Sequence, residues 1–189
     1  MFPPTKDEQI VNTALVVFLN ALTIHFDICQ TCNWTMHRKG FIAKFEETSF
    51  EARTDGYLDD GNENAYALIE VKPVVRGEKE NRIQMQESAQ MVGWLMNNAD
   101  MDIYDKLGIH MSQNRHEIFL TFADYDDDYL AYLQNKPPKK SALSFLKMHQ
   151  YGPWNTQSAS DMKQLGPILL AITLYAYTEI QAKQKPRQR

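Results

Sequence analysis

One strand-like run, AYALIEVKP at residues 65–73, constrains the fold of this chain more than any other segment. Side chains on a β-strand alternate between its two faces. One face of this run is wholly apolar and consists of Ala67, Ile69 and Val71. The opposite face consists of Tyr66, Leu68, Glu70 and Lys72. The run therefore predicts a strand that buries at least one face and holds a carboxylate beside an ammonium group on the other.

The residues before this run predict a hairpin that brings in a second acid. The stretch TDGYLDDGNEN, residues 54–64, joins a shorter alternating run to an acidic turn that contains glycine. If the turn is centred on residues 60–63, Asp55 lies directly opposite Glu70 or one diagonal step away. Either register places Asp55, Glu70 and Lys72 on the same face of the hairpin.

Two carboxylates and a lysine in one partly buried place indicate a particular chemistry. The carboxylates repel each other, and their burial is costly unless a cation or a proton lies between them. Oxygen ligands suit a hard cation such as Mg²⁺ or Mn²⁺, so we predict a metal site formed by Asp55, Glu70 and the backbone carbonyl of Val71. Lys72 is placed to orient a water molecule or to stabilise the leaving charge. This is the chemistry of phosphodiester hydrolysis.

The rest of the sequence predicts helices and strands in alternation. A helix is expected at about residues 6–25, with Thr5 and Glu8 as a capping box, and strand-like pieces follow between residues 33 and 58, with Gly40 and the Glu46–Glu47 pair at turns. The second helix, within residues 82–99, is expected to bury one apolar side. That side consists of Met85, Ala89, Val92, Leu95 and Met96.

The C-terminal half predicts two further strands and two helices. Residues 116–126 read as a strand, residues 127–135 as a short helix, and residues 143–150 as a short strand that leads to a turn at YGPW. Ser158 or Ser160 is expected to cap the last helix. Its predicted inward residues are Met162, Leu165, Ile168, Leu169, Ile172 and Tyr175. We expect an α/β (α+β) fold in which a central mixed β-sheet is flanked by helices.

Composition sets the class of protein. With 189 residues, 43% of them hydrophobic and 23% charged, the chain fits one folded domain covering residues 1–189. The longest apolar segments are interrupted by polar residues and proline, and the N-terminus lacks a basic flank and a cleavage site, so we expect an intracellular protein, nuclear or cytoplasmic, that is not associated with a membrane. The net charge of −4 argues against coating nucleic acid through bulk charge.

The order of Asp55, a hairpin turn, and then Glu70-x-Lys72 resembles the signature of the PD-(D/E)xK nuclease superfamily, with Thr54 in place of the proline. The resemblance covers roughly residues 6–125 and extends more loosely to the last helix, where the chain looks like uncharacterised fungal proteins of this superfamily. It implies a restriction-endonuclease-like core, namely a helix, a three-stranded antiparallel meander, a helix and a strand. It also implies an Mg²⁺- or Mn²⁺-dependent nuclease, with DNA the expected substrate ahead of RNA.

The resemblance extends the expected site beyond the hairpin. Where members of the superfamily have a glutamine on the following helix, its side chain lies beside the active site. Of Gln84, Gln86 and Gln90 we select Gln86, and Gln90 shares its helix face at i+4. Many members also use an acid from the first helix, which corresponds to Glu8. The expected catalytic residues are Asp55, Glu70, Lys72 and Gln86, and the expected metal ligands are Asp55, Glu70, Val71 and Glu8.

Other interpretations of the same residues remain open at this point. Asp55, Glu70 and Lys72 also fit a surface cross-strand ion pair, Glu8 fits a purely capping role, and the glutamines fit a solvated helix face. The acidic run at residues 123–129 resembles a calcium loop but fits a strand end and a helix cap better. A zinc site is a further alternative, with four residues as its ligands. These are His25, Cys29, Cys32 and His37.

Two alternatives concern function. The chain could be a catalytically inactive nuclease-fold protein that binds nucleic acid or protein. It could also form a homodimer through Met-rich and aromatic surfaces, which is compatible with either function. For a nucleic-acid substrate, the basic residues nearest the site, Arg76, Lys79 and Arg82, are expected to contact phosphates.

Overall fold

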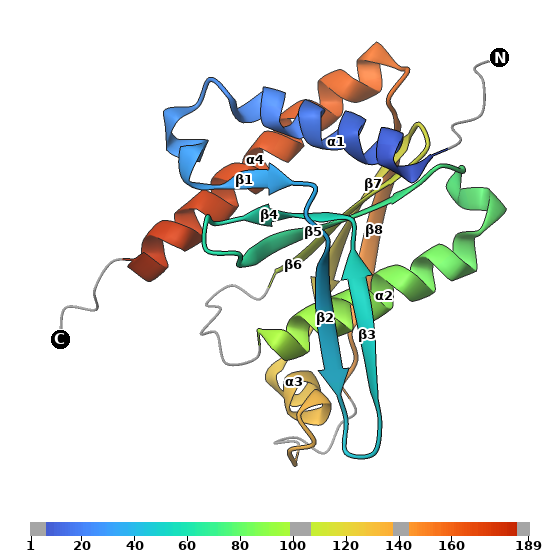
Figure 1. The fold of residues 1–189 in the computed structure, drawn as a ribbon, viewed down its shortest axis with the longest axis vertical. Helices are drawn as coiled ribbons and strands as arrows, with labels where there is room; N and C mark the ends of the chain where they lie inside the picture. The colour runs from blue at the N-terminus through green and yellow to red at the C-terminus, as the bar shows by residue number, and fades with distance from the viewer. Residues whose placement is uncertain (1–6, 99–106, 138–143, 185–189) are drawn as a thin grey trace.

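A six-stranded mixed β-sheet forms the centre of the computed structural model, which describes residues 7–98, 107–137 and 144–184 (Figure 1). The strand order in the sheet is β1-β4-β5-β6-β7-β8, and β5 and β6 are parallel while the other neighbours are antiparallel. Its strands are β1 (Asn33–Thr35), β4 (Gly56–Asp59), β5 (Ala65–Lys72), β6 (Gly108–Asn114), β7 (Glu117–Asp124) and β8 (Lys147–Asn155). Strands β2 (Lys39–Lys44) and β3 (Ser49–Thr54) form a separate two-stranded sheet.

Helices cover both faces of the sheet (Figure 1). The α-helices are α1 (Glu8–Thr23), α2 (Glu80–Asn97), α3 (Asp127–Leu133) and α4 (Ala159–Gln184), and the short 3-10 helices are η1 (Asp27–Thr31) and η2 (Arg76–Glu78). Helices α1 and α4 pack on the face that carries Ile69 and Met111, whereas α2 packs on the face that carries Leu68. The arrangement confirms the predicted mixed sheet flanked by helices. Alternation along β5 therefore separates two cores, as the period of two predicts.

The predicted elements agree with the structure at most places. The turn at Glu46–Glu47, strand β7, helix α3 and the inward face of α4 are confirmed. Asp126 caps α3, so the acidic run at residues 123–129 is a strand end and a cap. Ser158 Oγ accepts from the amide of Asp161 at 3.3 Å at the start of α4. Among the described residues, no helix is long and apolar enough to cross a membrane.

Three local predictions are wrong, and one strand is missing from the predicted elements. Asp7, and not a Thr5–Glu8 capping box, caps α1 by accepting from the amide of Gln9 at 2.9 Å, and Thr5 lies outside the described residues. Gly40 lies inside β2, because the chain turns earlier, after β1. The YGPW segment is part of β8, where a register shift against Ile118 to Leu120 of β7 accommodates the glycine and proline without a turn. Strand β6 was not predicted at all.

The inward face of α2 also differs from the prediction. Met85 is 72% exposed, and the buried face instead includes Ile83, Glu87, Gln90 and Met91. Leu95 is buried and Val92 and Met96 pack against the same core, as predicted, but hydrophobic periodicity missed two inward side chains because they are polar. Both form hydrogen bonds inside the protein, which removes the cost of burying them.

One of these polar residues, Glu87, belongs to a buried network centred on Arg76. The guanidinium of Arg76, which is 3% exposed, forms a bidentate ion pair with Glu87 and donates to Asn114 Oδ1 at 2.9 Å and to Ser112 Oγ at 2.6 Å. It also lies 4.3 Å from the ring centroid of Phe119. The network joins η2, α2, β6 and β7, and so it holds the start of α2 against the sheet.

We predict that Arg76→Ala destabilises the protein by about 3–5 kcal/mol, because it leaves the Glu87 carboxylate buried without its cation. Urea or thermal unfolding measures the change. The double substitution Arg76→Met with Glu87→Leu should recover much of the lost free energy of unfolding, since it removes both charges. A small effect of Arg76→Ala, comparable with that of the exposed Arg53→Ala, would contradict the assignment.

Candidate active site

The register of the β4–β5 hairpin places Asp55 opposite Glu70. Gly56 pairs with Ile69, so the residue before Gly56 faces the residue after Ile69. The amide of Asp55 donates to the carbonyl of Ile69 at 3.0 Å, and the amide of Val71 donates to Asp55 Oδ2 at 3.1 Å. The predicted register and the predicted shared face are therefore confirmed. The surface ion pair is excluded, because Asp55 is 6% exposed and Glu70 1%.

The Glu70 carboxylate receives three side-chain donors. Lys72 Nζ and Gln86 Nε2 both donate to Oε1, and the distance from Gln86 Nε2 is 2.6 Å. Gln90 Nε2 donates to Oε2 at 2.5 Å. Burial raises the pKa of Glu70 to about 7, with a further contribution from the negative charge of Asp55. Donation from Lys72 and Gln90 opposes this rise without cancelling it. The site therefore concentrates negative charge in a place where water is excluded.

Lys72 joins the buried carboxylate to the surface. Its ammonium contacts Glu70 and also lies 3.4 Å from Glu8 Oε1 on α1, so Glu8 is brought to the site as predicted. Burial alone would lower the pKa of Lys72, but the carboxylates of Glu70, Glu8 and Asp55 outweigh burial and raise it. Lys72 is consequently an ammonium group at neutral pH, which makes it a donor and not a base.

Two of the three glutamines of α2 reach Glu70, namely the selected Gln86 and also Gln90. Gln90 is fully buried, and its amide nitrogen also donates to the carbonyl of Arg53 at 2.7 Å. Gln90 Oε1 lies 2.8 Å from Nε2 of His110, so this ring nitrogen carries the proton. Burial lowers the pKa of His110, which keeps the ring neutral. His110 thereby orients the amide of Gln90 toward Glu70.

Sequence reasoning missed three residues around the site: His110, Arg38 and Asn12. Arg38 contacts Asp55 Oδ1 at 3.1 Å with a side chain that is 62% exposed. Asn12 Nδ2 donates to the backbone carbonyl of Asp55 at 2.8 Å. A polar residue on the otherwise apolar inward face of α1 is a signal that could have identified Asn12. No periodic pattern marks Arg38, which lies in the connection between β1 and β2.

A cavity of about 460 Å³ adjoins these groups. Its lining includes Glu8, Lys72 and Gln86 from the site and two basic residues, Lys79 and Arg82. The expectation that Arg76 contacts phosphates is wrong, because its guanidinium is buried against Glu87. Lys79 and Arg82 are exposed and remain available to an anion.

The donor set fits a hard divalent cation. Mg²⁺ usually takes one or two protein carboxylates and completes its shell with water and substrate phosphate. Asp55 and Glu70 are such a pair, and each attracts a cation in this structure, Arg38 and Lys72 respectively. Among the described residues, no group of three or more His, Cys, Asp or Glu side chains could hold a metal ion. The carbonyl of Val71 as a ligand stays a prediction.

The zinc alternative does not agree with the structure. Cys29 and Cys32 are buried free thiols, and His25 and His37 are exposed. Burial raises the pKa of Cys29, and it raises that of Cys32 to about 11 with a further contribution from Cys29. Protonated thiols are poor zinc ligands. Cys32 Sγ instead lies 3.6 Å from the carbonyl of Cys29, as expected for a packed thiol.

Comparison of the chain with protein-family models, with curated proteins and with solved structures found no match. The interpretation of the site therefore rests on its geometry and on its chemistry.

We predict that metal-free protein loses stability as pH rises from about 4.5 to about 7, relative to Glu70→Gln. Burial raises the folded-state pKa of Glu70 above its ordinary value of 4.5 to about 7, so the folded state keeps a proton that the unfolded state releases. The stabilising contribution is complete below about pH 4.5 and is lost as pH reaches the folded value. Urea unfolding in EDTA measures the difference, and equal pH profiles for the two proteins would contradict it.

Proposed function

We propose that this protein is a metal-dependent nuclease that hydrolyses phosphodiester bonds, with DNA the expected substrate ahead of RNA. The observation that carries the proposal is the pair of buried carboxylates, Asp55 and Glu70, opposed across the β4–β5 hairpin with Lys72 Nζ on Glu70. The residues of the Asp and Glu-x-Lys signature thus share one place in the fold as well as a sequence pattern.

A structural role explains this arrangement poorly. Two adjacent buried carboxylates reduce stability, and an apolar pair of similar volume would be more favourable. The raised pKa of Glu70 records this cost. Strongly perturbed groups that lie beside a cavity mark functional sites more often than packing sites. The charge of Asp55 and Glu70 is explained if the site binds a cation as part of its function.

The surface around the pair suits a phosphate substrate. Lys72, Lys79 and Arg82 line the adjoining cavity, so three cationic groups face the space beside Glu70. Lys79 and Arg82 are exposed, and neither has to break a buried ion pair before it contacts a phosphate. Such contacts fix the position of a nucleic acid and do not depend on its sequence.

Each residue has a distinct role in the proposed reaction. Asp55, Glu70 and the Val71 carbonyl would hold Mg²⁺ or Mn²⁺, and Glu8 lies at the rim as a further candidate ligand. When bound, such an ion acts as a Lewis acid and lowers the pKa of bound water. Lys72 holds its proton on Nζ and donates it in hydrogen bonds that position water or neutralise phosphate charge. Gln86 and Gln90 fix the orientation of Glu70.

We predict that purified protein cleaves supercoiled plasmid or labelled single- or double-stranded DNA with Mg²⁺ or Mn²⁺, and that EDTA abolishes cleavage. Lys72→Ala should lower the rate by roughly 100-fold or more, because a donor to the developing charge is lost. Lys163→Ala, on the exposed side of α4, is the matched control and should retain full activity.

The opposite result has a clear meaning. If wild type and Lys72→Ala are equally inert on every substrate, and calorimetry detects no Mg²⁺ or Mn²⁺ binding that Asp55→Ala removes, the chain is not a metal-dependent nuclease. A nucleic-acid-binding or protein-binding module that lacks turnover is then the better description.

The two rim cations give a second prediction. Replacing Lys79 and Arg82 together with alanine should raise KM severalfold and lessen the dependence of binding on salt, because two phosphate contacts are removed. The value of kcat should change little, since neither side chain contacts Asp55 or Glu70 in the structure. A fall in kcat at unchanged KM would place these residues in the reaction itself.

A further inference from the structure

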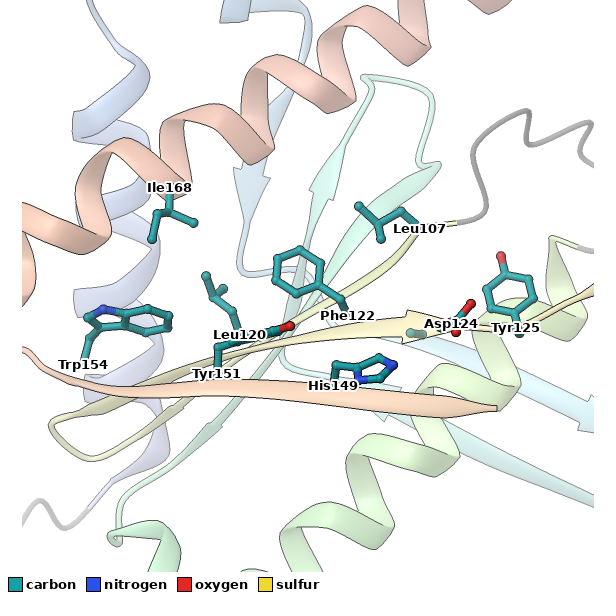
Figure 2. Close-up of a pocket in the computed structure, with 10 residues that line it drawn as sticks. Leu107, Leu120, Phe122, Asp124, Tyr125, His149, Tyr151, Trp154 and Ile168 are labelled. Carbon is teal, nitrogen blue, oxygen red and sulfur yellow. The ribbon is translucent and has the colours of Figure 1, made fainter. Parts of the chain in front are cut away.

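A second cavity, of about 690 Å³, opens on the face of the sheet opposite Glu70 (Figure 2). Ring side chains make up much of its lining, which also includes the aliphatic residues Leu120 and Ile168. The ring-bearing residues are Phe122, Tyr125, His149, Tyr151 and Trp154. Its volume lies in the range of ligand-binding pockets, which is roughly 300–1,000 Å³. We call it the ring groove.

The ring groove follows a ladder of cross-strand pairs between β7 and β8. Successive pairs along one face are Asp124 with Lys147, Phe122 with His149, Leu120 with Tyr151 and Ile118 with Trp154. Residues of one strand that share a face are two positions apart, so their side chains repeat about every 6.8 Å. The register shift in β8 adds one residue before Trp154 and keeps its ring in the same row. The rings therefore form an elongated series, as Figure 2 shows.

The protein interior accounts for three of these rings, because Phe122 and Trp154 are half-buried against the core on the α1 and α4 side and Tyr125, at 9% exposure, belongs to the core on the α2 side. Leu120 forms the floor at 1% exposure, but Tyr151 is 54% exposed and His149 is also exposed. Within the described part of the chain, helix α4 borders the ring groove at one end, where Ile168 forms a wall and Trp154 Nε1 donates to Gln164 Oε1 at 2.9 Å. The ring of Tyr151 stands edge-on to that of Phe122, at 5.8 Å and 68°. Tyr151 is exposed on β8, at the edge of the sheet, and Phe122 is half-buried beside it on β7.

We propose that the ring groove binds the bases of a single-stranded nucleic acid. Every base has a flat face that stacks on aromatic side chains, and the neighbouring rings of His149, Tyr151 and Trp154 along β8 are placed to accept successive bases. Lys147 and Asp124 lie side by side at one end of the row. The ammonium group suits a backbone phosphate, and the carboxylate accepts from the exocyclic amino group of a base.

Other occupants fit less well. The base faces of a double helix are covered by their neighbours in the stack, so a duplex cannot use the rings in this way. A second copy of this chain would have to pair along the edge of β8, but Lys147 and Pro153 in this strand oppose edge-to-edge pairing. The ladder has one acid and one base at its end, and the remaining positions are rings or the aliphatic residues Leu120 and Ile118, so it offers little to a strongly charged peptide.

The inference rests on the proposed function only in naming the same class of substrate. Phe122 pairs with Ile109, on the α1 and α4 side, whereas Glu70 faces α2, so the ring groove and the site lie on opposite faces of the sheet. The segment bound in the ring groove is therefore separate from the bond that is cleaved. Binding in the ring groove requires no metal ion and can be measured without catalysis.

The test measures fluorescence anisotropy of labelled single-stranded DNA, single-stranded RNA and duplex DNA in EDTA. Both single strands should bind more tightly than the duplex, and Tyr151→Ala with His149→Ala should weaken that binding roughly tenfold or more. Tyr151→Phe keeps the ring and should bind as wild type. Tyr132→Ala removes a ring that is 69% exposed on α3 and is the matched control.

Tryptophan fluorescence gives an independent readout. Trp34 and Trp94 are 3% and 4% exposed, whereas Trp154 lines the ring groove, so bound bases should quench Trp154 selectively. Trp154→Phe should remove most of this quenching. Quenching that persists in Trp154→Phe would overturn the proposed location.

Each remaining outcome also decides the question. Unchanged single-strand affinity in the Tyr151 and His149 variant, or no single-strand binding by wild type, overturns the ring groove even if metal-dependent cleavage is present. A dimer that dissociates on Tyr151→Ala assigns the surface to a second copy instead. If wild type shows no cleavage but binds single strands through these rings, the nuclease proposal fails and the ring groove stands.

Discussion

The burial of Glu70 beside Asp55 is the constraint on which the rest of the structure depends. A carboxylate that is 1% exposed needs donors on both oxygens, and these come from Lys72 of its own strand and from Gln86 and Gln90 of α2. The hairpin register fixes where the charge lies, and the orientation of α2 decides whether it is satisfied. Sheet and helix are thus coupled through one side chain.

The Arg76 network explains how α2 keeps that orientation. The buried face of α2 combines apolar residues with Glu87 and Gln90, and each of these two polar side chains has its own hydrogen-bond partners. An apolar face can slide or rotate against a sheet at modest cost, but a bidentate ion pair and an oriented amide cannot. The neutral ring of His110 adds a further orienting contact from β6, because it determines which end of the Gln90 amide faces Glu70.

These polar contacts also determine what could be predicted from the sequence. The hairpin face and the pairing of Asp55 with Glu70 follow from a period of two and a turn, which are local properties. Strand β6 was missed because four of its buried residues, His110, Ser112, Gln113 and Asn114, are polar and look like a loop. The partners of His110, Ser112 and Asn114 lie far away along the chain, so no local pattern reveals that these three are satisfied. The inward residues Glu87 and Gln90 of α2 were missed for the same reason.

Alternation along the strands gives the two faces of this sheet different physical properties. Around Glu70 water is excluded, so charges there act strongly and a carboxylate can hold a proton near neutral pH. Along β8 the rings of His149 and Tyr151 are open to solvent, where charge is screened but the proposed stacking on bases would still contribute affinity. A chain with a net charge of −4 gains little from general attraction to phosphates. The proposed stacking of bases on the rings does not depend on charge, so the net negative charge weakens it less than it weakens phosphate contacts. A single strand is the form of nucleic acid that exposes its base faces for such stacking.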